Sequence, residues 1–112
     1  MANFQSITPI KIAQAEMPTS AGLFYTVPDN SRIFLKDINI ANTTNNTIGA
    51  TIYLVPNGDS AGTANALIYQ WRLFSYDLYR WQGVQIMNAG DEIYIEASDT
   101  GLTVVASGAQ AV

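Results

Sequence analysis

The chain has 112 residues, the length of one ordinary domain, and charged residues make up only 12% of it, so part of its surface is expected to be covered by another protein chain. Its formal net charge is −4 with only five basic residues, which disfavours binding to nucleic acid or to an anionic membrane because both need a basic surface. Cysteine and histidine are both absent, which excludes disulfides, thiolate metal sites and the commonest metal ligand.

Short apolar runs separated by turn signals begin near the N-terminus and are typical of strands in a sandwich or barrel. The first run, residues 6–15, contains Pro9, which cannot donate to a central ladder, so this strand is expected to lie at an edge or to bend there. The second run, residues 23–27, ends at a turn predicted over residues 28–31, where proline and small polar residues favour chain reversal.

The next two runs, residues 33–41 and 48–55, have the composition of strands. In the first, the apolar positions change parity half-way, and a β-bulge near Lys36 and Asp37 would account for the change. The second alternates cleanly and is expected to turn Ile48, Ala50, Ile52 and Leu54 to one face. Loops are predicted at residues 42–47 and 57–66, which are polar and rich in small residues respectively.

Residues 67–81 fit two interpretations. Apolar residues at spacings of four and three follow the pattern of an amphipathic helix, but the many aromatic residues favour strands and no capping box is present. Two strands, at about residues 67–74 and 77–82 with a turn at 75–77, agree better with the rest of the chain and are the favoured prediction.

The C-terminal part predicts a turn at residues 88–91 and then a strand over 91–98 that turns Ile93, Ile95 and Ala97 inward. A turn at 99–101 is expected to close a hairpin onto residues 102–107. The whole chain therefore predicts an all-β fold, an antiparallel β-sandwich of about eight strands with a jelly roll as one arrangement. It would form a single domain over 1–112, in which residues 1–8 could extend as an N-terminal arm.

No catalytic constellation is apparent. A serine nucleophile would need a neighbouring base, and no histidine is present to act as one. Most of the nine acidic residues fall in predicted turns or outward strand positions, so a carboxylate-based hydrolase is the least favoured alternative. We therefore expect no enzyme activity, no cofactor and no metal, although a calcium site at Asp91, Glu92 and Asp99 stays an open alternative.

Aromatic residues are concentrated in one segment, where six of the twelve fall within residues 69–81 beside two arginines. Strand alternation cannot turn all of them inward, and Tyr, Trp and Arg dominate the energetics of protein interfaces. An interface is the favoured interpretation, with a division between core and scattered surface, or stacking on sugar rings, as alternatives. The predicted contact residues are Tyr69, Trp71, Arg72, Phe74, Tyr76, Tyr79, Arg80, Trp81 and, from the N-terminal arm, Phe4.

A series of short motifs runs in a fixed order from residue 23 to residue 107: FYTVP at 24–28, INIANT at 38–43, IYLVPNG at 52–58, SAG at 60–62, ANAL at 64–67, Trp81, AGD at 89–91 and then the predicted terminal hairpin. In this order the sequence resembles small phage and prophage virion proteins of about 110 residues, a size typical of one domain. The resemblance implies a β-sandwich that decorates a capsid or forms part of a neck or tail. It supplies no catalytic residues, and residues 69–80 are unusually aromatic for such proteins.

This resemblance implies a phage virion structural protein that assembles through apolar and aromatic contacts. Its expected partners are copies of itself and other virion proteins, such as the major capsid protein or neck and tail proteins, with no nucleic acid and no membrane. The implied location is the virion, assembled in the host cytoplasm. The alternative function is a tail-tip module that binds a glycan or receptor.

Overall fold

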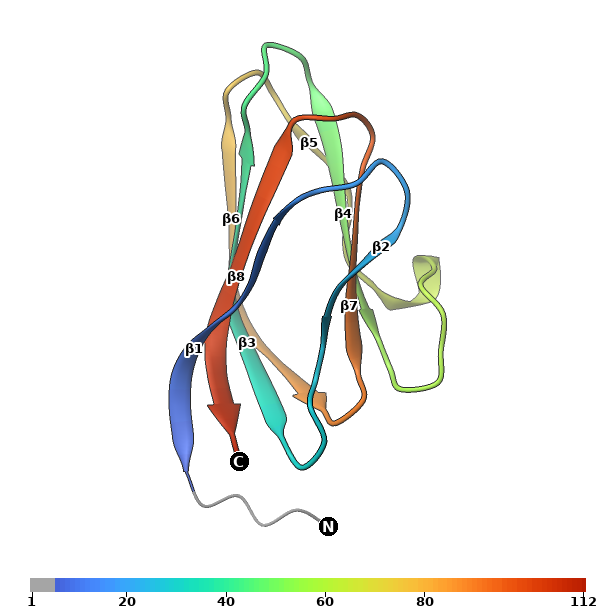
Figure 1. Ribbon diagram of the computed structural model, residues 1–112. Helices are drawn as coiled ribbons and strands as arrows, with labels where there is room; N and C mark the ends of the chain where they lie inside the picture. The colour runs from blue at the N-terminus through green and yellow to red at the C-terminus, as the bar shows by residue number, and fades with distance from the viewer. Residues whose placement is uncertain (1–5) are drawn as a thin grey trace.

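Eight strands and one short 3-10 helix make up the computed structural model, which describes residues 6–112 (Figure 1). No helix in this part of the chain is long and apolar enough to cross a membrane. The elements are β1 (Ile7–Glu16), β2 (Gly22–Thr26), β3 (Arg32–Asn42), β4 (Ile48–Val55), η1 (Thr63–Asn65), β5 (Ala66–Leu73), β6 (Leu78–Asn88), β7 (Glu92–Ala97) and β8 (Leu102–Ala111).

The strands form two antiparallel four-stranded sheets, in the orders β1-β8-β3-β6 and β2-β7-β4-β5. The chain folds back on itself, so that its two ends lie side by side: β1 pairs with β8, β2 with β7, β3 with β6 and β4 with β5. This is the strand order of a jelly roll. The predicted all-β sandwich is therefore confirmed. The strand that contains Pro9 lies at a sheet edge, as expected.

The hairpin predicted at the C-terminus is wrong. β7 pairs with β2 and β4, whereas β8 pairs with β1 and β3, so the turn after Ala97 crosses from one sheet to the other. Two amphipathic strands joined by a short turn have the same alternation whether they pair side by side or face each other across a core. Within residues 6–112, β4 and β5 are the consecutive strands that do pair as neighbours.

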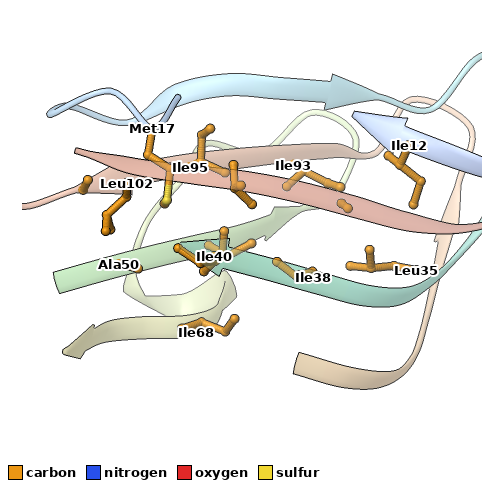
Figure 2. Close-up of a cluster of buried hydrophobic side chains, with 14 of the residues drawn as sticks. Ile12, Met17, Leu35, Ile38, Ile40, Ala50, Ile68, Ile93, Ile95 and Leu102 are labelled. Atoms are coloured by element: carbon orange, nitrogen blue, oxygen red, sulfur yellow. The ribbon is translucent and has the colours of Figure 1, made fainter. Parts of the chain in front are cut away.

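The core lies between the two sheets and is built mainly from isoleucine, which suits the pleated surface of a strand (Figure 2). The predicted inward set of β7, Ile93, Ile95 and Ala97, is buried to 2% exposure or less. Met17, from the loop after β1, also reaches this core and is 1% exposed. Together these side chains hold the two sheets against each other.

Two irregularities in the strands explain the patterns that were ambiguous in the sequence. The bulge predicted near Lys36 is confirmed, because the pairing of β3 shifts register between Leu35 and Asp37 against both neighbours. Residues 67–81 form two strands, so the helix alternative is wrong. In β5 the backbone of Gln70 has φ of 49°, and the pairing with β4 is irregular beside it. The apolar residues at helical spacing do not share one face, because Trp71 faces the core side and Phe74 lies on the outer side.

Candidate interaction site at the β5–β6 edge

β5 and β6 are the last strands of their respective sheets, and they face each other along one open edge of the sandwich. The rings of Trp71 on β5 and Tyr79 on β6 bridge this edge, with centroids 4.7 Å apart and planes tilted by 30°. Trp71 pairs with Ala50, and Tyr79 pairs with Ile40, two residues with 0% exposure, so both rings lie on the core-facing side of their strands.

Trp81 continues the aromatic row along β6. It pairs with Ile38 of the core and is half-buried, and its indole lies over Gly83. A Cβ at Gly83 would lie 3.0 Å from that ring, so the glycine allows the indole to lie flat along the strand. Tyr76 lies in the turn that joins β5 to β6. We call Trp71, Tyr76, Tyr79 and Trp81 the aromatic edge.

The aromatic edge leaves much of its ring surface in solvent. Trp71 is 50% exposed and Tyr76 is 72% exposed. Tyr76 also has φ of 56°, in the left-handed region that a tyrosine seldom occupies. Tyr76 is therefore an exposed ring held on a strained backbone, an arrangement that contributes little to stability.

The backbone of the two edge strands is only partly open to another strand. Both pairings contain an irregularity, next to Gln70 in β5 and near Gly83 in β6, so an added strand could not pair along the full length. Arg72 and Arg80 are the charged residues of the two strands, and both lie on outer faces of the sheets. A partner at this edge would therefore meet rings and aliphatic side chains rather than charges.

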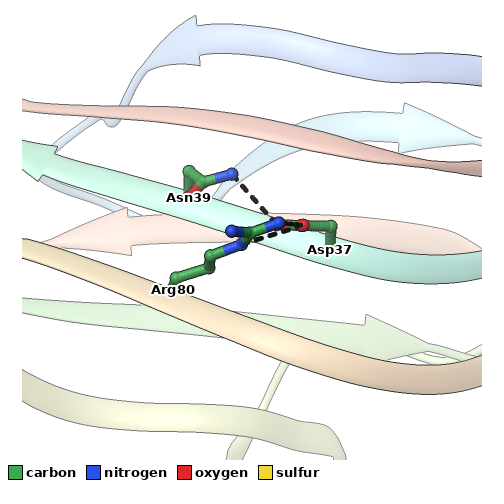
Figure 3. Close-up of polar contacts among 3 residues, drawn as sticks. All are labelled: Asp37, Asn39 and Arg80. Carbon is green, nitrogen blue, oxygen red and sulfur yellow. Dashed lines mark hydrogen bonds and ion pairs between the residues drawn. The ribbon is translucent and has the colours of Figure 1, made fainter.

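Arg80 lies on the opposite face of β6 from Tyr79 and Trp81. Its Nε and Nη2 donate to Oδ2 of Asp37 at 3.0 and 2.7 Å, while the side chain of Asn39 donates to Oδ1 of the same carboxylate at 2.9 Å (Figure 3). These hydrogen bonds raise the pKa of the Arg80 guanidinium above its usual value. Arg80 thus serves an ion pair on the outer face of the β1-β8-β3-β6 sheet.

Tyr69 and Arg72 lie on the other side of β5, on the outer face of the β2-β7-β4-β5 sheet, and Phe74 directly follows the strand. They border a hollow of about 890 Å³ whose floor includes Tyr53 of β4 and Glu96 of β7. We call this hollow the outer groove. The predicted cluster is therefore divided among three surfaces: the aromatic edge, the outer groove and, for Arg80, the outer face of the other sheet. Phe4 lies outside the described residues.

A second apolar surface escaped the sequence prediction. Across the outer face of the β1-β8-β3-β6 sheet, Pro9, Ala109, Phe34 and Ile86 pair in one continuous row, and Ile7 flanks it. Ile7 and Ile86 are 66% and 60% exposed. The row joins four strands from both ends of the chain, so no local pattern could have predicted it, although the outward position of each residue follows from alternation.

The described residues contain no group of three or more acidic side chains that could hold a metal ion. Asp91 and Asp99, two of the residues considered for calcium, lie before and after β7 and so at opposite ends of that strand. Asp91 instead accepts hydrogen bonds from the backbone N–H groups of Asn57 and Asn88 at 3.0 and 2.8 Å, which ties together two loops.

The fold has counterparts among solved structures. It is similar over 96% of its length to a chain in the structure of infectious bursal disease virus, Gx strain, with a TM-score of 0.55 and 13% sequence identity. A chain in the structure of the Gt strain of that virus has a TM-score of 0.49 and 14% identity over 96% of the present chain. This chain spans 32% of the length of each. No protein-family model matches the sequence, and no curated protein matches it significantly.

Proposed function

We propose that this chain is a non-enzymatic structural protein of a virus particle, which assembles through the aromatic edge. The fold supports the class, because the jelly-roll strand order is common in the coat proteins of viruses and the fold is similar to that of a chain in a virus structure. A shared fold does not by itself assign a function, so the proposal depends on the site.

More specifically, we propose a bacteriophage protein that decorates the capsid or forms part of the neck or tail. The order of short motifs between residues 23 and 107, which resembles small phage virion proteins, supports this assignment. Its partners would be copies of itself and a larger virion protein, and its place would be the particle assembled in the host cytoplasm.

The observation that carries the proposal is the edge between β5 and β6, two strands that each pair on one side only. There Trp71 and Tyr76 are exposed, while Tyr79 and Trp81 are partly buried. Tyr and Trp are enriched at the centres of protein interfaces because they bury large areas with little loss of side-chain entropy. At about 25 cal/mol per Å² of apolar area, such a contact becomes strong when a particle repeats it many times.

Size-exclusion chromatography with light scattering tests self-association of the purified chain. The native chain should form an oligomer, and Trp71→Gln combined with Tyr76→Asn should reduce its mass to that of a monomer. Asn tolerates the left-handed backbone at Tyr76, so this substitution removes the ring without adding strain.

Leu23→Ser is the matched control, since Leu23 is a 56% exposed apolar residue on β2, an edge strand on the other side of the sandwich. It should leave the oligomer unchanged, and thermal unfolding should show that all variants are folded. An oligomer that persists in the double variant, or one that only Leu23→Ser disrupts, would rule out assembly through the aromatic edge.

A further inference from the structure

The outer groove carries chemistry that the aromatic edge does not use, and we propose that it binds a neutral oligosaccharide. Its volume of about 890 Å³ lies within the range of roughly 300–1,000 Å³ typical of small-molecule sites. Its lining mixes hydroxyl, amide and carboxylate groups with aromatic rings. The groove is lined by Thr19, Thr47, Gly49, Thr51, Tyr53, Tyr69, Gln70, Arg72, Phe74, Glu96, Ala97 and Ser98.

The floor of the groove presents a fixed carboxylate. The hydroxyl of Tyr53, a residue only 8% exposed, donates to Oε1 of Glu96 at 3.2 Å. Burial raises the pKa of Tyr53, and the hydrogen bond to Glu96 acts in the same direction, so the hydroxyl stays protonated as a donor. The second oxygen of Glu96 makes no hydrogen bond with the described residues and can accept one from a ligand hydroxyl.

The wall on the β5 side presents rings and a cation. Tyr69 and Phe74 are 52% and 63% exposed, and Arg72 between them makes no hydrogen bond or ion pair with the described residues. A pyranose has an apolar C–H face surrounded by hydroxyl groups, so it can lie against a ring while its hydroxyls meet the charged groups. An aromatic ring beside a carboxylate and a guanidinium matches that chemistry.

An irregularity in β5 positions this wall. Regular alternation from the buried Ile68 would turn Tyr69 outward, Trp71 outward and Arg72 inward. The left-handed residue Gln70 breaks the alternation, so that Arg72 joins Tyr69 at the groove and Trp71 faces the core side. The N–H of Gln70 donates to the 5% exposed Thr51 at 3.0 Å, which fixes the bulge.

Other ligand classes fit this lining less well. A phosphate-rich ligand would meet the carboxylate of Glu96, and a purely apolar ligand would leave the floor hydroxyls without partners. Glycoside hydrolysis uses two carboxyl groups, whereas the residues that line the groove include one. The arrangement is therefore suited to binding a sugar and not to cleaving it.

The sugar site is independent of the proposed assembly function, because the outer groove and the aromatic edge lie on opposite faces of β5. Variants at Glu96 leave Trp71 and Tyr79 in place, and variants at the aromatic edge leave the groove floor in place. Loss of sugar binding and loss of assembly can therefore be observed separately.

Saturation-transfer difference NMR on the native chain tests the site with maltohexaose, cellohexaose and chitohexaose at about 1 mM, a concentration suited to weak binding. At least one sugar should receive saturation at the C–H protons that lie against the rings. Tyr69→Ala should abolish this transfer, and Glu96→Gln should weaken binding at least about tenfold, as expected when a charged hydrogen bond is lost.

Glu92→Gln is the matched control, since Glu92 lies on the same strand but outside the groove lining. It should bind the sugar as the native chain does. The proposal is overturned if none of the three sugars receives saturation, or if binding survives both Tyr69→Ala and Glu96→Gln, because the sugar would then lie elsewhere.

Discussion

Asn42 shows how a single buried side chain positions the end of the aromatic edge. It is 3% exposed, and its amide nitrogen donates to the carbonyls of Asn46, Leu73 and Phe74 at 2.7, 3.1 and 3.1 Å. Its oxygen accepts from the N–H and hydroxyl of Thr44 at 2.9 and 2.7 Å. The loop after β3 is thereby tied to the turn that carries Tyr76, which gives the asparagine of the INIANT motif a structural reason.

Asn42→Ala should lower the free energy of unfolding by about 2–3 kcal/mol, because it leaves buried carbonyls without donors. Denaturant unfolding measures this loss. Asn46→Ala is the matched control: its side chain is exposed and makes no hydrogen bond with the described residues, so its effect should stay below about 0.5 kcal/mol. Equal effects of the two substitutions would contradict the role given to Asn42.

Tyr53 links stability to alkaline pH. Its pKa is raised from the usual 10.0 by burial first and then by Glu96, so folding favours the protonated phenol. That contribution is complete below pH 10.0 and is lost as pH rises through the higher pKa of the folded chain, since the unfolded chain loses its proton first. As pH rises above 10.0, the free energy of unfolding should therefore fall less for Tyr53→Phe than for the native chain. Denaturant unfolding across that pH range measures this difference.

At the scale of the elements, sequence patterns predicted well wherever apolar and polar residues alternate clearly. The parity change in β3 predicted its bulge, and the inward set of β7 was predicted residue by residue. The ends of β6 and β8 were not predicted. β8 continues from Ser107 to Ala111 over mostly small residues. They have little strand preference but pair with β1 on one side and β3 on the other.

Close approach of two backbones explains one of these small residues. Gly108 on β8 lies beside the bulge of β3, where a Cβ would overlap the carbonyl oxygen of Phe34. Gly108→Ala should lower the free energy of unfolding by about 3 kcal/mol, the cost of forcing strands apart. Gly62→Ala is the control, because Gly62 is extended and nothing lies within 4 Å of its Cβ. A stable Gly108→Ala protein would contradict this packing.

At the scale of the whole molecule, pairing between distant strands could not be predicted from local patterns. The chain end was expected to form a hairpin, yet β7 and β8 belong to different sheets because each finds its partners near the start and middle of the chain. The same limit applies to the candidate site. The sequence identified the aromatic segment and predicted that some of its rings are not turned inward, but not that the bulge at Gln70 divides them between two faces.

The measurement that tests the central claim most directly uses the two tryptophans of the chain, Trp71 and Trp81, which both belong to the aromatic edge. Acrylamide quenching of their fluorescence should be measured over a series of protein concentrations, with the mass of each sample determined by light scattering. If the chain assembles through this edge, quenching should fall as the mass rises. An oligomer with unchanged quenching, or a monomer at every concentration, would contradict the account.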